Sequence, residues 1–204
     1  MTEATTRIRY SSVGETLEVP VINQLMRIPL ENPGILSLAA GFTDNATLPS
    51  DLVLDIVSKL PETNSNTEYL QYGTTQGRPK LRELTCAHVE TYPSERPGSF
   101  DPGQTFITNG SQQALFLATL TLCDPGDIVL VENPTYFVYL SMLQGMQIRP
   151  VGIPVDESGR VDAAGFADLL SDLEAKGELP KIKATYLMGY HANPSARCLQ
   201  RWEK

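Results

Sequence analysis

The chain has 204 residues, 41% of them apolar and 20% charged, a composition that predicts a folded globular chain and excludes extended disorder and collagen-like repeats. Sixteen Lys and Arg against 24 Asp and Glu give a net charge of −8, which repels phosphate backbones and anionic lipids, so we expect neither a nucleic-acid nor a membrane partner. Three widely spaced cysteines without a CxxC pair argue against a disulfide framework and a zinc site, and favour a reducing cytoplasm.

The first part of the chain predicts an arm followed by two helices. Residues 1–50 are rich in Pro, Asn and Gly and carry only short apolar patches, so we predict an N-terminal arm outside the core. Apolar residues at helical spacing begin at Ser50, a plausible N-cap, and the run ends at Pro61. A loop with Gly and Tyr follows over residues 67–79, and helical periodicity resumes over 80–90.

After a turn-rich connection, short apolar runs alternate with helical patterns. We predict strands over residues 105–108, 127–132, 147–153 and 183–188, and helices over 111–122, 135–146 and 162–176. Strands that alternate with helices in this way indicate βαβ units. The fold class is therefore α/β, with a mostly parallel sheet covered by helices on both faces and preceded by the arm.

The first candidate site lies where the predicted strand 105–108 gives way to a helix. Ligands of open α/β sheets bind beyond the carboxyl ends of the strands. Here the chain reads Asn109-Gly110-Ser111-Gln112. Gly110 allows the backbone to approach a ligand, and the first amides of the helix favour a phosphate or a carboxylate. The simpler alternative is that Ser111 caps the helix and Gly110 makes a turn.

Two more strand exits carry residues that suit a ligand. Tyr136 follows the strand over 127–132, where its ring can stack on a planar heteroaromatic group or fill the core. Asn193 precedes a proline after the strand over 183–188, and its amide can donate to a ligand oxygen or close a local turn. Together the three exits favour a planar, phosphorylated cofactor.

Five segments in order resemble those of a known family. They are 35–42 (ILSLAAGF), 69–84 (YLQYGTTQGRPKLREL), 108–115 (TNGSQQAL), 123–136 (CDPGDIVLVENPTY) and 190–195 (YHANPS). The chain resembles the N-terminal half of the fold type I pyridoxal-phosphate enzymes, in particular the class I/II aminotransferases. The resemblance implies pyridoxal 5'-phosphate as cofactor. It implies that the Gly110 backbone, Ser111 and Gln112 hold the phosphate, that Tyr136 stacks on the pyridine ring, and that Asn193 donates to the phenolic oxygen.

Two further roles and one departure rest on the resemblance alone. Tyr72 would reach the phosphate bound by the neighbouring subunit of a dimer, and Gly41 would approach the substrate carboxylate. Residues 1–50 then comprise the arm with the substrate-loop segment, and residues 51–204 comprise part of the cofactor-binding large domain. The family usually has Gly where this chain has Ala196, and a positive φ there would cost an alanine about 1 kcal/mol.

The family's catalytic groups have no counterpart in the matched segments. In the family, the lysine that bonds covalently to the cofactor, the aspartate beside its ring nitrogen and the arginine that binds the substrate carboxylate all follow the Asn-Pro segment, and this chain ends ten residues beyond Pro194. None of the lysines present has the Ser-rich context of the family's lysine, so we assign no catalytic residue.

The expected activity is therefore that of the family, transfer of an amino group from an amino acid to a 2-oxo acid, without turnover by this chain alone. We expect a homodimer or association with a C-terminal half. Two alternatives stay open: a non-catalytic module that binds the cofactor or a half-enzyme partner, and a truncated product without function.

Overall fold

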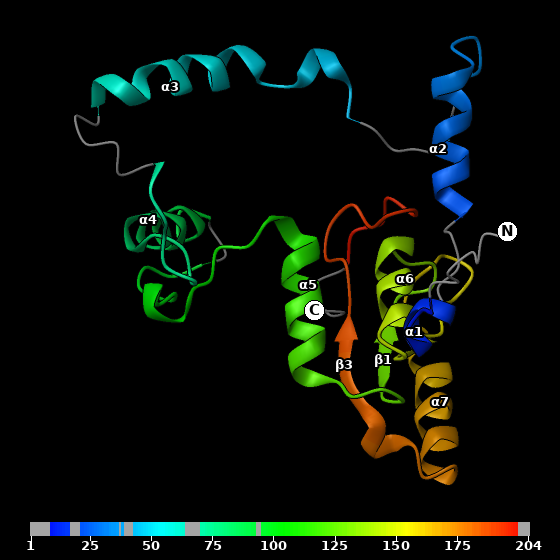
Figure 1. The fold of residues 1–204 in the computed structure, drawn as a ribbon. Coiled ribbons are helices and arrows are strands. Elements are labelled where there is room, and N and C mark those ends of the chain that lie inside the picture. Colours follow the sequence, from blue (N-terminus) through cyan, green and yellow to red (C-terminus); the bar gives the residue numbers. More distant parts are fainter. Residues whose placement is uncertain are drawn as a thin grey trace, which may run out of the picture. The chain divides into compact units, whose positions relative to one another are not determined.

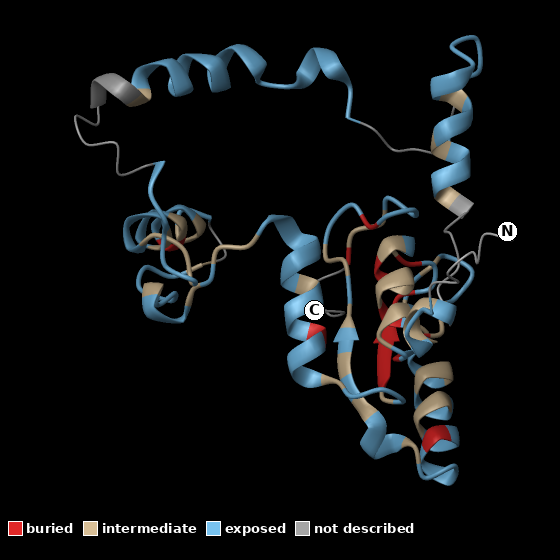
Figure 2. Cartoon of the chain, in the orientation of Figure 1, coloured by how far each residue is buried: buried red, intermediate tan, exposed pale blue. Residues whose placement is uncertain are grey.

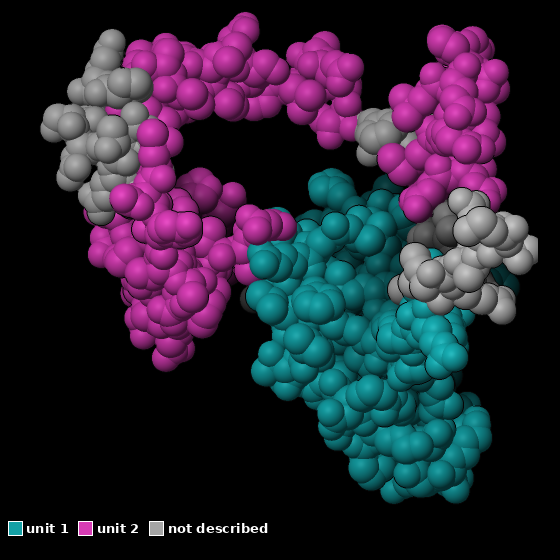
Figure 3. Space-filling model, in the orientation of Figure 1, with its two compact units in different colours: residues 1–20, 110–204 teal, residues 21–109 magenta. Residues whose placement is uncertain are grey.

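The computed structural model describes residues 9–16, 21–36, 38, 43–63, 70–92 and 95–199. Backbone contacts divide the chain into two compact units, coloured separately in Figure 3. Unit 1 comprises residues 1–20 and 110–204, and unit 2 comprises residues 21–109. No helix in the described ranges combines the length and apolar character needed to cross a bilayer.

A parallel sheet forms the centre of unit 1. Its strands are β1 (Ile128–Val131), β2 (Arg149–Gly152) and β3 (Ile182–Tyr186), in the order β2-β1-β3. Val129 pairs with Pro150 of β2 and with Ala184 of β3, and both pairings are parallel. The predicted parallel sheet and three of its four predicted strands are confirmed.

Helices cover both faces of this sheet, as the sequence predicts (Figure 1). Val129 and Val131 pack on one face with residues of α5 (Gly110–Leu122) and α6 (Phe137–Gly145). Ile128 and Leu130 pack on the other face with residues of α7 (Ala163–Ala175). The short α1 (Ser12–Thr16) contacts α6.

The central position of β1 explains its composition. Successive side chains of a strand point to opposite faces, so a strand covered on both faces must be apolar throughout. The four residues of β1 are all buried, and this strand is red in Figure 2. The run Ile-Val-Leu-Val therefore identifies the central strand, which packs against helices on both faces of the sheet.

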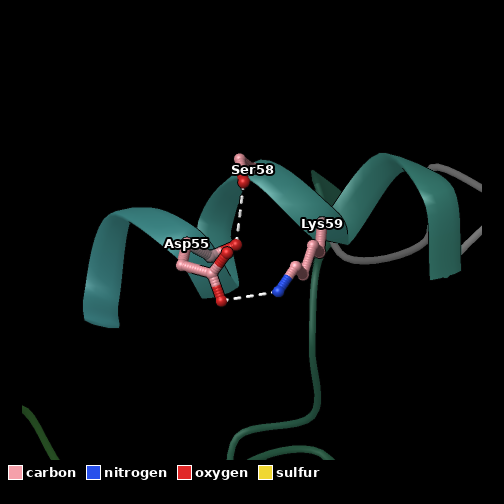
Figure 4. Close-up of polar contacts among 3 residues, drawn as sticks. All are labelled: Asp55, Ser58 and Lys59. Carbon is pink, nitrogen blue, oxygen red and sulfur yellow. Dashed lines mark hydrogen bonds and ion pairs between the residues drawn. The ribbon is translucent and has the colours of Figure 1, made fainter. Parts of the chain in front are cut away.

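Unit 2 is built mainly from helices. These are α2 (Val21–Glu31), α3 (Ser50–Thr63) and α4 (Pro79–Val89), with 3₁₀ turns at Asn45–Thr47 and Pro102–Gln104. On α3, the Lys59 ammonium lies 2.6 Å from a carboxylate oxygen of Asp55, while the Ser58 hydroxyl donates to the Asp55 carbonyl (Figure 4). An exposed i,i+4 pair of this kind supports a helix by only a few tenths of a kcal/mol, about 0.3–0.5.

The structure corrects the sequence prediction at one predicted strand. The predicted strand over 105–108 is wrong, because these residues pair with no strand in the described ranges. The Ile107 amide donates instead to the carbonyl of Gln76, in a turn of the same unit. Within residues 1–50, the predicted arm, the chain forms α1 and α2, and most α2 side chains are exposed.

Candidate functional site

The carboxyl ends of all three strands lie at one edge of the sheet, because the strands are parallel. Figure 1 shows the arrow of β3 pointing toward the end of the unit where α5 begins. From β1 the chain passes through α6 to β2, and from β2 through α7 on the opposite face to β3. The connections that leave the carboxyl ends of β1 and β2 therefore pass to opposite faces of the sheet, which creates the kind of crevice where α/β sheets bind ligands.

The N-terminus of α5 lies at this edge of the sheet. Gly110 begins the helix with φ +76°, and no atom lies within 4 Å of where its Cβ would be. Ser111 and Gln112 are exposed in the first turn, which carries no acidic residue. The helix dipole is therefore not neutralised by a neighbouring carboxylate, and the first turn suits an anion.

Gln112 links this helix end to the predicted stacking ring. Its side-chain amide donates to the Tyr136 hydroxyl over 3.4 Å. Tyr136 is half-buried and immediately precedes α6, with its ring centroid 5.4 Å from that of Phe137. Two residues predicted to contact one cofactor, 24 positions apart in the sequence, are thus brought together.

Beside Tyr136 lies a buried hydroxyl that lacks a partner. Thr135 is only 8% exposed, and its Oγ1 makes no hydrogen bond to any described residue. Thr135 lines a cleft of about 390 Å³ with residues from the ends of β1 and β2. Since buried polar groups are nearly always hydrogen-bonded, an orphaned hydroxyl at a strand exit fits a site that accommodates a polar group.

Asn193 lies in the loop that follows β3. Its backbone amide donates to the Met188 sulfur over 3.4 Å, its side chain is exposed, and its side-chain amide makes no hydrogen bond within the described ranges. Ala196 in the same loop has φ +56°, the left-handed conformation on which the predicted strain depends. The loop thus keeps an amide donor available beyond the end of β3.

Sequence reasoning missed Glu132, which follows β1 directly. Glu132 is only 8% exposed, and its carboxylate accepts a hydrogen bond from the Met188 amide over 3.0 Å. Burial, and then the Glu132 charge, raise the pKa of Tyr186. One sequence signal could have identified Glu132: a carboxylate directly follows a wholly apolar strand. Charged side chains are rarely buried unless they are paired, so such a position suggests a specific contact.

Two predicted site residues lie elsewhere. Tyr72 belongs to unit 2 and is fully exposed, with its amide donating to the side chain of Gln71. Gly41 falls outside the described residues. The other predicted residues, Gly110, Ser111, Gln112, Tyr136 and Asn193, all belong to unit 1.

The described lysines of unit 1 lie at the opposite edge of the sheet. Lys176 follows the carboxyl end of α7, while Lys181 and Lys183 lie at the start of β3. All three are exposed, as are Lys59 and Lys80 in unit 2. Within the described ranges, no lysine lines the clefts beside Glu132.

Comparison with known proteins gives a consistent family. The model of the family "Aminotransferase class I and II" matches residues 33–195. The chain is 32% identical to aromatic-amino-acid aminotransferase 1 of Thermococcus litoralis over 187 residues, which are 91% of this chain and 43% of the relative. It is 30% identical to glutamate-pyruvate aminotransferase AlaC of Escherichia coli over 171 residues, covering 81% of this chain and 37% of that protein.

Solved structures agree with the sequence comparison. A crystal structure of Pyrococcus horikoshii kynurenine aminotransferase in complex with PMP is similar with a TM-score of 0.79 and 28% identity, over 95% of this chain and 46% of that one. An archaeal alanine:glyoxylate aminotransferase is similar with a TM-score of 0.80 and 26% identity, over 95% and 47%. The chain thus spans less than half the length of these relatives.

Proposed function

The chain belongs to the class I and II aminotransferase family, and from this premise we propose that it binds pyridoxal 5'-phosphate and serves amino-group transfer between an amino acid and a 2-oxo acid. When bound, this cofactor supplies an electron sink for the carbon that loses its proton. The observation that carries the proposal is the hydrogen bond from Gln112, in the first turn of α5, to Tyr136. PMP, the pyridoxamine form of the cofactor, in the Pyrococcus complex supports it.

In this proposal each residue at the edge has one task. The amides that follow Gly110 bind the phosphate, together with the Ser111 hydroxyl. Gln112 holds the hydroxyl of Tyr136, so that the ring lies ready to stack on the pyridine ring. The Asn193 amide donates to the phenolic oxygen of the cofactor. The residues present fit the cofactor, since a single edge of the sheet offers partners for its phosphate, its ring and its phenolic oxygen. The same edge also contains the Thr135 hydroxyl, which has no hydrogen-bond partner among the described residues.

We propose that the 204 residues bind the cofactor without turnover by themselves. The support is the position of the described lysines, which are exposed and, in unit 1, lie at the opposite edge of the sheet. The relatives named above act on different amino acids, so the substrate is proposed only as an amino acid with its 2-oxo acid acceptor.

Titration with two ligands tests this function. We expect the chain to bind both pyridoxal phosphate and inorganic phosphate, and Gly110→Ala to weaken both affinities about tenfold by crowding the approach to the amides. Gly177→Ala is the matched control, because Gly177 also has a positive φ and open space around its Cβ position but follows α7 at the opposite edge. Equal affinity loss in the two variants, or no phosphate binding by the wild type, would overturn the proposal.

A second candidate function is a cofactor-binding partner for a separate polypeptide, including a homodimer partner or a C-terminal half. One edge of β3 pairs with β1, and its other edge pairs with no described strand. Unpaired edges bind additional strands readily. Borohydride reduction with the cofactor, followed by mass analysis, tests for a working lysine. A pyridoxyl adduct on one specific lysine would favour an enzyme and contradict binding without turnover, whereas reversible binding without adduct is expected for a cofactor-binding module.

The remaining assignments belong to the same proposal. Residues 1–50 would be the arm and residues 51–204 part of the large domain, Tyr72 would contact the phosphate of a neighbouring subunit, and Gly41 the substrate carboxylate. A cytoplasmic location is proposed from the composition of the chain.

A further inference from the structure

Glu132 is an unusual carboxylate for its position. Glu132 directly follows the last residue of β1 at the edge of the crevice, and only 8% of its surface is exposed. Its partner is a backbone amide, and within the described ranges no Lys, Arg or His forms an ion pair with it. Burial of a carboxylate costs free energy unless hydrogen bonds compensate it, so a buried carboxylate is weak evidence for a contribution to stability.

The contacts of Glu132 cross from one strand exit to the other. Its backbone amide donates to the Tyr186 carbonyl at the end of β3, over 3.3 Å. Its carboxylate then accepts the Met188 amide, two residues further along and 56 positions away in the sequence. The side chain therefore continues the pairing of β1 with β3 past the point where both strands end.

Met188 also contacts Asn193, further along the same loop. Its sulfur accepts the Asn193 amide over 3.4 Å. The loop is otherwise closed on itself, by the Leu199 amide donating to Gly189 and the Ala192 amide donating to Arg197. The Glu132 bond attaches the Met188 end of this loop to the residue that follows β1.

We propose that Glu132 is a positioning residue for the cofactor. By holding Met188, it fixes the height of Asn193 above the sheet, and so aligns the Asn193 donor with the ring of Tyr136, which follows Glu132 on the same strand exit. This inference rests on the proposed function, because it assigns Asn193 the phenolic oxygen of pyridoxal phosphate.

Three variants test the proposal. Glu132→Ala removes the acceptor; Glu132→Gln keeps an acceptor of the same size; Met188→Leu removes the sulfur, conserves the volume and keeps the amide that Glu132 binds. The first readout is amide hydrogen exchange without ligand, and the second is affinity for pyridoxal phosphate beside affinity for inorganic phosphate.

In Glu132→Ala we expect exchange at Met188 to accelerate at least about tenfold and pyridoxal phosphate to bind about tenfold more weakly, while inorganic phosphate binds unchanged at α5. Glu132→Gln restores both values to near those of the wild type, and Met188→Leu accelerates exchange at Asn193 alone. Exchange in β1 serves as the control for folding.

Unchanged exchange at Met188 in Glu132→Ala overturns the positioning role. So does a parallel loss of pyridoxal phosphate and inorganic phosphate affinity, which indicates a general structural role. If the wild type binds neither ligand, the proposed function fails, and the exchange of Met188 and Asn193 still decides whether Glu132 holds the loop.

Discussion

The side-chain amide of Gln112 donates to the hydroxyl of Tyr136 over 3.4 Å, and this contact joins the start of α5 to the start of α6. Both helices begin at the carboxyl edge of the sheet. An anion held by the first turn of α5 and a ring stacked on Tyr136 would therefore belong to one ligand. Tyr136 contributes a ring face as well as the hydroxyl that Gln112 binds, so mutation can test the two contributions separately.

Replacing Tyr136 tests the stacking role. Tyr136→Ala should weaken pyridoxal phosphate binding about tenfold, since stacking contributes about 0.5–1.5 kcal/mol beyond buried area. Tyr136→Phe keeps the ring and should cost about twofold, through loss of the long Gln112 bond. Absorbance titration measures both, with inorganic phosphate as the control ligand. Equal losses for Phe and Ala would show that the hydroxyl, and not the ring face, contacts the cofactor.

Ala196→Gly should stabilise the chain by about 0.5–1 kcal/mol, because Ala196 has φ +56° and glycine adopts that conformation without steric cost. Urea denaturation checks the change in free energy of unfolding. Ala167→Gly, at an exposed position inside α7, is the control and should destabilise by about 1 kcal/mol. Destabilisation by both substitutions would contradict the strained conformation of Ala196.

Gly77→Ala should destabilise unit 2 by about 2–4 kcal/mol. Gly77 has φ +96°, and an added Cβ would lie 2.5 Å from Cγ1 of Ile107. Gly98→Ala is the matched control, because Gly98 has φ +78° but no atom within 4 Å of the Cβ position. The control should cost about 1 kcal/mol, through backbone strain alone. Thermal unfolding of the two variants compares them, and equal shifts would exclude the clash with Ile107.

Acid should weaken unit 1 partly through Glu178. A hydrogen bond from the Arg149 guanidinium, 2.6 Å long, lowers the pKa of the Glu178 carboxyl. The folded state therefore favours the carboxylate, so the pair stabilises above the ordinary pKa of about 4.3 and loses this contribution as pH falls through the lowered folded value.

Arg149→Gln should accordingly flatten the fall in unfolding free energy between about pH 5 and pH 3. Denaturation at several pH values measures the slope. Because the Arg149 side chain is exposed and that of Glu178 is partly so, 1 M salt should reduce the difference between the variant and the wild type. An identical slope in the two proteins at low salt would rule out the Arg149 contribution.

The sequence predicted the parallel sheet because that part of the chain carries strong periodic signals. β1 falls within the predicted strand over 127–132, and α7 within the predicted helix over 162–176. The four-residue pattern at 105–108 agrees with the extended backbone of Thr105 but says nothing of a neighbouring strand, which a strand requires. α2 was missed because Pro29 interrupts its pattern, although the structure continues the helix past it.

The candidate site was predictable only where local chemistry is visible. Gly110 and Tyr136 stand at strand exits, and their residue types suggest a ligand from neighbouring sequence alone. Glu132 could not be assigned a role in this way, because its partner Met188 lies 56 positions away and binds through a backbone amide common to every residue but proline.

Four large apolar side chains of α5, those of Phe116, Leu117, Leu120 and Leu122, are each more than 40% exposed. Fluorescent dyes such as ANS bind surfaces of this kind, and their brightening is commonly used as a sign of a molten globule. The folded chain should therefore give a bright dye baseline at low temperature. Near-ultraviolet circular dichroism is the better reporter of folding, because the rings of Tyr139 and Tyr186 pack 4.4 Å apart in the core.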